Sequence, residues 1–339
     1  MGEAKSINSL MKHMRDKHSI KIGTGVHKGG THKKDLSNIG YYHGYKGYRF
    51  IKNKNNSIVF KDFNEIVNIN KFDMELKALI YPKIMFLETA IKNHTLECIF
   101  KYTKKSDFES IYDEILVSYK EIRRCDYRND DKYQIEYKNR LSKRLRLRTE
   151  VYSNLHRNFN SDTTVIQHFY NDNRDVPIWA IFEVITMGTL GDFISNMKKD
   201  AREYLSQSIG LNRTQDTNSV FAAKTIYTLK DLRNSVAHNN VIFDVRFRSG
   251  DISRNFKRAI ESETVINNIT FDSIVDYIIL IVYLLKGLGE SKTEMRRFVN
   301  GFVHIIEEFR QNINIAYYNK IIPTDTRGKL KKLNVFISN

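Results

Sequence analysis

Proline is nearly absent from this chain, and its scarcity constrains the fold more than any other feature of the sequence. Only 3 of the 339 residues are proline and 16 are glycine. Proline interrupts helices because it lacks a backbone N–H, and glycine weakens them because it loses the most conformational freedom on folding. A chain with so few of both favours helices over a turn-rich β protein. We therefore predict an all-α fold.

Apolar residues at helical spacing predict where the helices lie. Residues 63–102 read as one or two long helices that Pro82 kinks or divides. Residues 271–288 and 291–317 predict two more, and the apolar run 277–285 is too short to span a bilayer. We expect three parts: a basic segment over 1–61 that contains many Gly, His and Tyr residues, a helical domain over 62–320, and a peripheral basic tail over 321–339. Within the first part, residues 23–34 predict a flexible basic loop.

A helix predicted over residues 219–240 carries the candidate catalytic side chains. Its apolar stripe follows the spacing of a helix with one buried face: Ala222, Ile226, Leu229, Leu232 and Val236. Asn234 and His238 lie on nearly the same face, whereas Arg233 lies roughly 140° away from His238. One copy of the helix does not easily assemble a complete site, but two copies facing each other would.

Arginine, asparagine and histidine together suit RNA cleavage without a metal or cofactor. The His238 imidazole can move protons near neutral pH, and the Arg233 guanidinium can hold charge on a pentacoordinate phosphate. Asn234 can orient the imidazole or the phosphate. An ordinary helix end explains the same residues, with Arg233 in a salt bridge and His238 capping the last carbonyls. Spacing alone leaves both interpretations open.

The charge of the chain favours an anionic partner. There are 55 Lys and Arg residues against 39 Asp and Glu, which gives a formal net charge of +16 and indicates nucleic acid or an anionic membrane surface. An AT-rich genome raises lysine content without any such function. Arg140, Arg144 and Arg148 recur every four residues, with Lys143 beside them. They predict a line of cations along an RNA backbone, against the alternative of a solvated face.

A tyrosine-rich block over residues 36–50 has two interpretations. Its tyrosines alternate with Lys46 and Arg49, so the rings can stack on RNA bases while the cations hold phosphates. The same block can instead form an aromatic cap on the helical core. The two cysteines, Cys98 and Cys125, have no metal-ligand companions and read as reduced thiols. The N-terminus lacks the apolar run of a signal peptide, and we expect a cytoplasmic protein.

Blocks along residues 36–248 resemble the Abi family of bacterial abortive-infection proteins, of the AbiD/AbiF type, within the HEPN nuclease superfamily. The family writes its site as Arg-Asn-x-x-Ala-His-His, and this chain keeps that pattern from Arg233 to His238 but has Asn239 in place of the second histidine. Further matches are the Tyr-Tyr…Gly-Tyr block, a Phe-Asp-x-Glu-Leu segment that begins at Phe72, and a Pro-x-Trp block that begins at Pro177.

The resemblance implies an all-α, HEPN-like helical bundle with a basic, partly irregular N-terminal extension. It also implies an anti-phage or toxin-type endoribonuclease whose composite site forms in a homodimer, and it adds Arg246 as a phosphate-binding candidate. A non-catalytic RNA-binding protein that forms a complex with a small non-coding RNA is the alternative. We expect Glu88 to be a structural partner of a buried cation, Glu183 to brace Arg233 or face solvent, and Trp179 to lie in the core.

Overall fold

The structure is a computed structural model that describes residues 5–23, 29–161, 164–211 and 215–339. Over these residues the chain forms fifteen α-helices, one π-helix and two short 3-10 helices, and its only β-type pairings are isolated bridges. The predicted all-α class is confirmed. In chain order the elements are α1 (Ile7–His18), α2 (Gly29–Ile39), the π-helix η1 (Gly40–Lys46), α3 (Phe63–Tyr102), α4 (Phe108–Glu114), η2 (Tyr119–Glu121), η3 (Arg124–Asp126), α5 (Asp130–Asn160), α6 (Thr164–Asn171), α7 (Ile178–Val184), α8 (Met187–Asn196), α9 (Lys199–Ser208), α10 (Phe221–Ala237), α11 (Arg254–Thr264), α12 (Ile274–Gly287), α13 (Lys292–Asn312), α14 (Ile315–Ile321) and α15 (Thr326–Ser338).

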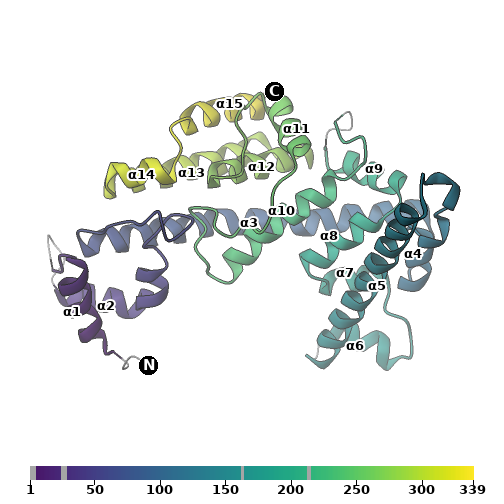
Figure 1. The fold of residues 1–339 in the computed structure, drawn as a ribbon, viewed down its shortest axis with the longest axis horizontal. Helices are drawn as coiled ribbons and strands as arrows, with labels where there is room; N and C mark the ends of the chain where they lie inside the picture. Colours follow the sequence, from purple (N-terminus) through teal and green to yellow (C-terminus); the bar gives the residue numbers. More distant parts are fainter. Residues whose placement is uncertain (1–4, 24–28, 162–163, 212–214) are drawn as a thin grey trace.

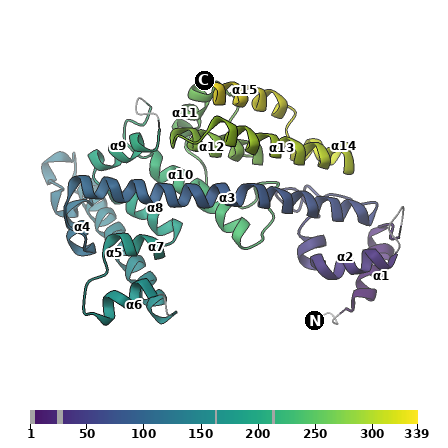
Figure 2. The same ribbon diagram turned by 180° about the vertical axis from the view of Figure 1, so that it is seen from behind.

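Helix α3 is the axis of the molecule. Figures 1 and 2 show it running through the whole structure, with α1 and α2 at one end and α4 to α9 at the other. Helix α10 lies against its middle, and α11 to α15 cover one side. A capping box starts α3, in which the Asp62 carboxylate accepts from the backbone and Glu65 reaches back.

Pro82 lies inside α3 and does not divide it, so of the two predicted alternatives, one long helix or two, the structure has one. Proline at this position removes the N–H that would donate to the carbonyl of Ala78 and costs about 3 kcal/mol in an isolated helix. The flanking residues Ile80, Ile84 and Leu87 are all fully buried. Their burial against neighbouring helices, at roughly 2 kcal/mol each, outweighs the local cost.

The helix that carries the candidate motif forms as predicted. In α10, Ala222, Ile226, Leu229 and Leu232 are buried and Val236 packs against the core. The predicted stop is also confirmed, because Asn239 has a left-handed backbone with φ of 54°.

The N-terminal segment is more regular than predicted. Residues 29–34, expected in a loop, begin α2, where His32 is fully buried beside the Phe63 ring, with the two ring centroids 4.9 Å apart. Residues 24–28 of the predicted loop lie outside the described residues. The tyrosine block forms an aromatic cap, since Tyr41, Tyr45 and Tyr48 are all buried. One hydrophobic core runs from Met11 to Ile337, so the N-terminal residues that the structure describes, 5–23 and 29–61, pack as part of the helical body.

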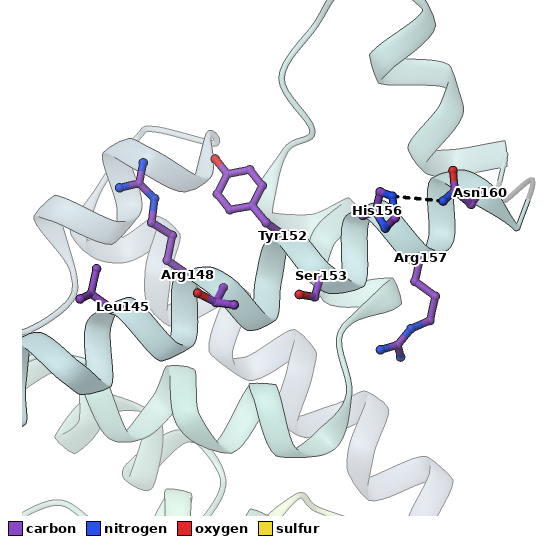
Figure 3. A pocket seen from close by; sticks show the side chains of 8 residues that line it. Leu145, Arg148, Tyr152, Ser153, His156, Arg157 and Asn160 are labelled. Atoms are coloured by element: carbon purple, nitrogen blue, oxygen red, sulfur yellow. Dashed lines mark hydrogen bonds between the residues drawn. The ribbon is translucent and has the colours of Figure 1, made fainter.

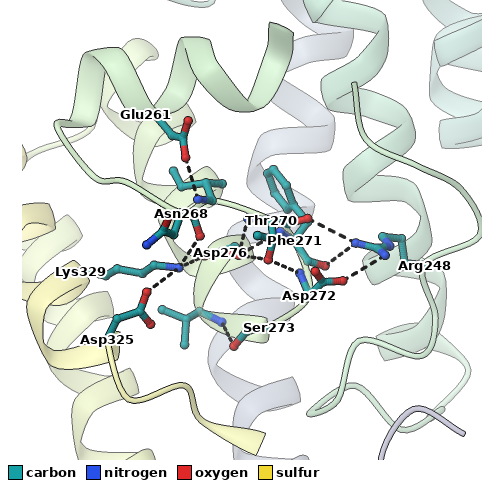
Figure 4. A network of polar contacts seen from close by, with 12 residues as sticks. Arg248, Glu261, Asn268, Thr270, Phe271, Asp272, Ser273, Asp276, Asp325 and Lys329 are labelled. Carbon is teal, nitrogen blue, oxygen red and sulfur yellow. Dashed lines mark hydrogen bonds and ion pairs between the residues drawn. The ribbon is translucent and has the colours of Figure 1, made fainter. Parts of the chain in front are cut away.

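The predicted peripheral tail over residues 321–339 is wrong as well. Helix α15 packs against α12 and α13, and Leu333 and Ile337 are fully buried. Its Lys329 Nζ lies 2.9 Å from the buried Asp276 Oδ1 and also donates to the Asn268 carbonyl. Figure 4 shows Lys329 reaching from α15 into this network. A basic segment is therefore fixed to the core, because one of its cations neutralises a buried carboxylate.

Candidate functional site at the end of helix α10

The turn that ends α10 places His238 at the surface. His238 is the C-cap residue, the Asn239 N–H donates to the Val236 carbonyl at 3.1 Å, and the Asn240 N–H donates to the Ser235 carbonyl at 2.8 Å. This pair of bonds with a left-handed residue between them is the Schellman motif. The His238 side chain is exposed and makes no hydrogen bond or ion pair with any residue that the structure describes. Its imidazole is free to contact a ligand.

Arg233 points toward α3 and still reaches Asn234. Its Nε lies 3.2 Å from Glu88 Oε2, and its Nη1 donates to Asn234 Oδ1 at 3.3 Å. The Glu88 side chain is buried and also pairs with Lys92 at 3.4 Å. The guanidinium is therefore fixed by one carboxylate, while 30 % of the Arg233 side chain stays exposed. Glu88 is the structural partner that the sequence predicted. Glu183 faces solvent.

A second pair on α3 holds the residue after His238. Lys77 Nζ donates to Asn239 Oδ1 at 2.8 Å and lies 2.6 Å from Asp73 Oδ2. Asp73 in turn accepts from the backbone N–H groups of Ile242 and Phe243 at 2.8 and 3.0 Å. Asn239, which replaces the second histidine of the resembled motif, is thus a bonded helix terminator. Sequence reasoning missed Lys77; its spacing of four from Asp73 on one helix was the available signal.

Arg246 has a structural role, because each of its three guanidinium nitrogens donates to a neighbouring group of the protein. It pairs with Asp244 at 2.7 Å and donates to the carbonyls of Gly47 and Phe50 at 2.7 and 2.6 Å. These bonds tie the loop after α10 to the end of the tyrosine block. Phosphate binding by Arg246 stays a prediction, and a phosphate would compete with these bonds.

The predicted cationic line on α5 is interrupted by packing. Arg144 is buried, with its Nη2 2.8 Å from Asp113 Oδ1 and its guanidinium over the Tyr112 ring. Arg140 pairs with Glu136, and Arg148 pairs with Glu109. Nearby acidic side chains therefore compensate the charge of all three arginines in the line. Lys143 is exposed and has no ion-pair partner among the described residues.

The outer face of α5 carries a different set of polar side chains. Figure 3 shows Arg148, Tyr152, His156 and Arg157 along an open groove of 820 Å³, in which Asn160 Nδ2 donates to His156 Nε2 at 3.2 Å. The exposed Arg157 has no ion-pair partner within the described ranges. Polar contact with a nucleic acid on α5 would use this groove and Lys143, because the buried Arg144 cannot reach it.

The cations of the tyrosine block stack on its own rings. Lys46 Nζ lies 5.6 Å from the centre of the Tyr41 ring, and the Arg49 guanidinium lies 5.4 Å from that of Tyr45. Burial raises the pKa of Tyr45 to about 12. Burial, with the neighbouring Asp73 carboxylate, also raises the pKa of Tyr48, whose hydroxyl donates to Asp73 at 3.1 Å. Both tyrosines are neutral and help to build the core, and Tyr48 also donates to Asp73.

Two cavities lie beside α10, one along its middle and one at its end. One, of 320 Å³, is lined by residues on the face of α10 that carries Asn234, including Tyr227 and Asp231, and by Arg248. Arg248 is oriented by Asp272, 3.1 Å away, as Figure 4 shows. The other, of 390 Å³, lies between η1 and the end of α10. No group of three or more His, Cys, Asp or Glu side chains in the described part of the chain is placed to hold a metal ion.

The family model described as Abi-like protein matches residues 34–244, which include η1, α3 and the whole Arg-Asn…His segment. This chain belongs to the Abi-like protein family. That membership supports an abortive-infection function. No curated protein and no solved structure matches the chain. None of the described helices of this Abi-like protein is long and apolar enough to cross a membrane.

Within the matched interval, the Pro-x-Trp block has a structure that differs from the prediction. Trp179, expected in the core, is 44 % exposed and meets the edge of the Phe169 ring. Gly188 lies in the first turn of α8, because Thr186 caps that helix by accepting from the Thr189 N–H. The Pro-x-Trp block thus forms two short helices joined at a cap.

Proposed function

We propose that this Abi-like protein is a metal-independent endoribonuclease that acts in abortive infection. The observation that carries the proposal is that the end of α10 presents two groups: an exposed, unbonded imidazole at His238 and, five residues earlier, the Arg233 guanidinium that Glu88 holds in place. An acid–base group and a fixed cation on one helix end suit a reaction in which protons move while charge builds up on a phosphate.

In the proposed reaction, His238 accepts the proton of a ribose 2′-hydroxyl. The 2′-oxygen forms a bond to the adjacent phosphorus, and the bond from phosphorus to the 5′-oxygen breaks. Arg233 stabilises the charge on the pentacoordinate phosphate, and Asn234 orients the guanidinium through the bond at 3.3 Å. The leaving 5′-oxygen takes a proton from a second imidazole. The products carry a 2′,3′-cyclic phosphate and a 5′-hydroxyl.

The second imidazole comes, in our proposal, from another copy of the chain. An apolar stripe on α3 supports this arrangement: Met74 and Tyr81 are 44 % and 39 % exposed, Ala78 is exposed, and Met85 is half-buried. These residues recur at helical spacing on the side of α3 that carries Lys77 and Glu88. A copy packed on this stripe would therefore lie beside both residues that hold the α10 motif.

The test is cleavage of single-stranded RNA in the presence of EDTA. Wild type is expected to release fragments that end in 2′,3′-cyclic phosphate, and His238→Ala is expected to lower the rate by at least about 100-fold. His304→Ala, which removes an exposed histidine on α13, is the matched control and should leave the rate unchanged. Equal cleavage by wild type and His238→Ala would refute the assignment.

RNA binding without cleavage is the second candidate function. The observation in its favour is that Lys143 and Arg157 are exposed and lack ion-pair partners among the described residues of a chain with a net charge of +16. In that case Lys143→Glu with Arg157→Glu should abolish binding to RNA, whereas His238→Ala should keep it and no condition should yield cleavage. Gel-shift titrations across a range of salt concentrations distinguish the two, since phosphate contacts give a steep salt dependence.

A further inference from the structure

The π-helix η1 holds one aromatic side chain away from the core. Tyr41, Tyr45 and Tyr48 are buried, but Tyr42 is 81 % exposed and His43 beside it is also exposed. Both line the 390 Å³ cavity whose opposite wall includes Ser235 and Asn240 of the turn that ends α10. The cavity therefore adjoins the turn that carries His238, two residues before Asn240.

The π-helix η1 and the residue that follows it need glycine at two positions, Gly44 and Gly47, because a side chain there has no room. A Cβ on Gly44 would lie 2.4 Å from Ile39 Cγ1, and a Cβ on Gly47 would lie 2.5 Å from the His43 carbonyl oxygen. Real Cβ atoms do not approach other atoms so closely, so both positions exclude larger residues. A π-helical turn is rare in proteins and occurs frequently at functional sites. Its energetic cost here is offset by the packing of Tyr41 and Tyr45.

Hydrogen bonds made by two charged side chains, Arg246 and Asp73, fix the two walls of the cavity to each other. Arg246 donates to the Gly47 and Phe50 carbonyls, and Asp73 joins the Tyr48 hydroxyl to the N–H groups of Ile242 and Phe243. The side chain of Asp73 is completely buried. The tyrosine block and the chain that leaves α10 are thus held in one arrangement before any ligand binds. Such preorganisation lowers the entropic cost of binding.

We propose that this cavity binds one unpaired nucleotide of the RNA next to the scissile phosphate, with its base stacked on Tyr42. The exposed ring offers a π-face, which every base can use, and His43 and Asn240 offer hydrogen bonds to the ribose or the base edge. A volume of 390 Å³ fits a ligand of this size. The subsite rests on the proposed ribonuclease function, which supplies the adjoining phosphate.

Direct binding of a labelled oligonucleotide tests the subsite without cleavage. The full chain with His238→Ala is titrated into single-stranded RNA that contains 2-aminopurine, and base stacking on a ring quenches its fluorescence. Adding Tyr42→Ala should raise the Kd by roughly 5-fold to 100-fold, as expected for the loss of one stacked base, and should remove the quench. Tyr42→Phe and Tyr42→Trp should keep both. Tyr102→Ala, an exposed aromatic residue at the far end of α3, is the matched control.

The outcomes separate this subsite from the ribonuclease proposal. If Tyr42→Ala binds with unchanged affinity and quench while wild type still cleaves RNA, the subsite is refuted and the ribonuclease stands. If no form cleaves but only Tyr42→Ala loses binding, the subsite stands on a non-catalytic protein. Thermal unfolding of each variant confirms folding, and an equal loss in Tyr42→Ala and Tyr42→Phe would also refute stacking. A side chain that is 81 % exposed contributes little to stability, so the variants should fold.

Discussion

Asn239 shows how one residue connects the end of a helix to the candidate site. Its backbone is left-handed, with φ of 54°, a conformation that asparagine tolerates better than most residues. Its amide oxygen also accepts from Lys77 at 2.8 Å. Because His238 immediately precedes it, the terminator also determines where the imidazole leaves the helix.

Asn239→Ala should lower the free energy of unfolding by about 1–2 kcal/mol. The substitution strains the left-handed backbone and leaves the buried Lys77 without one acceptor. Chemical denaturation measures the change. Asn240→Ala is the control at the next position, where the N–H rather than the side chain makes the bond to Ser235. Equal stability of Asn239→Ala and Asn240→Ala would contradict the role of Asn239.

At the scale of elements, α3 presents its apolar stripe beside the residues that hold α10. If a second copy packs there, a charge placed in the stripe must be buried without a partner. Tyr81→Asp should therefore raise the dissociation constant of the dimer at least about 100-fold and reduce cleavage in parallel, since an unpaired carboxylate costs on the order of 3 kcal/mol. Sedimentation velocity over a range of protein concentrations gives the constant.

Phe100→Asp is the matched control for the stripe. Phe100 is 43 % exposed and belongs to the same helix, but it lies near the C-terminal end of α3. It should leave both the dimer and the cleavage rate unchanged. A wild-type chain that sediments as a monomer at all concentrations, yet cleaves RNA, would refute the composite site.

The elements differ in how well the sequence predicts them. The apolar face of α10 follows from local periodicity, and its end follows from the left-handed conformation that asparagine tolerates. Both predictions are confirmed. Pro82 leaves open whether residues 63–102 form one helix or two, because the burial of Ile80 and Ile84 depends on helices far away in the chain. The cationic line on α5 misleads for the same reason. Arg144 finds Asp113, which is 31 residues away, and spacing along one helix carries no information about such a partner.

For the candidate site, the sequence predicts the motif but not what fixes it. Arg233, Asn234 and His238 are recognisable from their order, and Glu88 is predicted as a partner for a buried cation. The arrangement of Tyr42 depends on a π-helix that no periodicity indicates. The tail over residues 321–339 looks peripheral because it is basic, and only the three-dimensional packing pairs Lys329 with Asp276.

At the scale of the whole molecule, buried tyrosines make stability sensitive to alkaline pH. Burial raises the pKa of Tyr45 from 10.0 to about 12 in the folded chain. Tyr45 thus contributes its full stability below pH 10, and this contribution is lost as the pH rises from 10 toward 12, because the unfolded chain ionises first. Tyr45→Phe should flatten that decline. Urea unfolding at pH 8 to 11.5 measures it, and identical slopes for wild type and variant would contradict the assignment.

The bonds that α3 makes also set an order of events during synthesis. Glu88 precedes Arg233 by 145 residues, Lys77 precedes Asn239 by 162, and Asp73 precedes Ile242 by 169. At roughly 5–20 residues per second, α3 leaves the ribosome about 10–30 s before its partners exist. A nascent chain therefore lacks the bonds that fix the Arg233 guanidinium, hold Asn239 at the end of α10 and join the tyrosine block to the chain after α10. An activity that damages the host's RNA would stay silent until translation has passed the site.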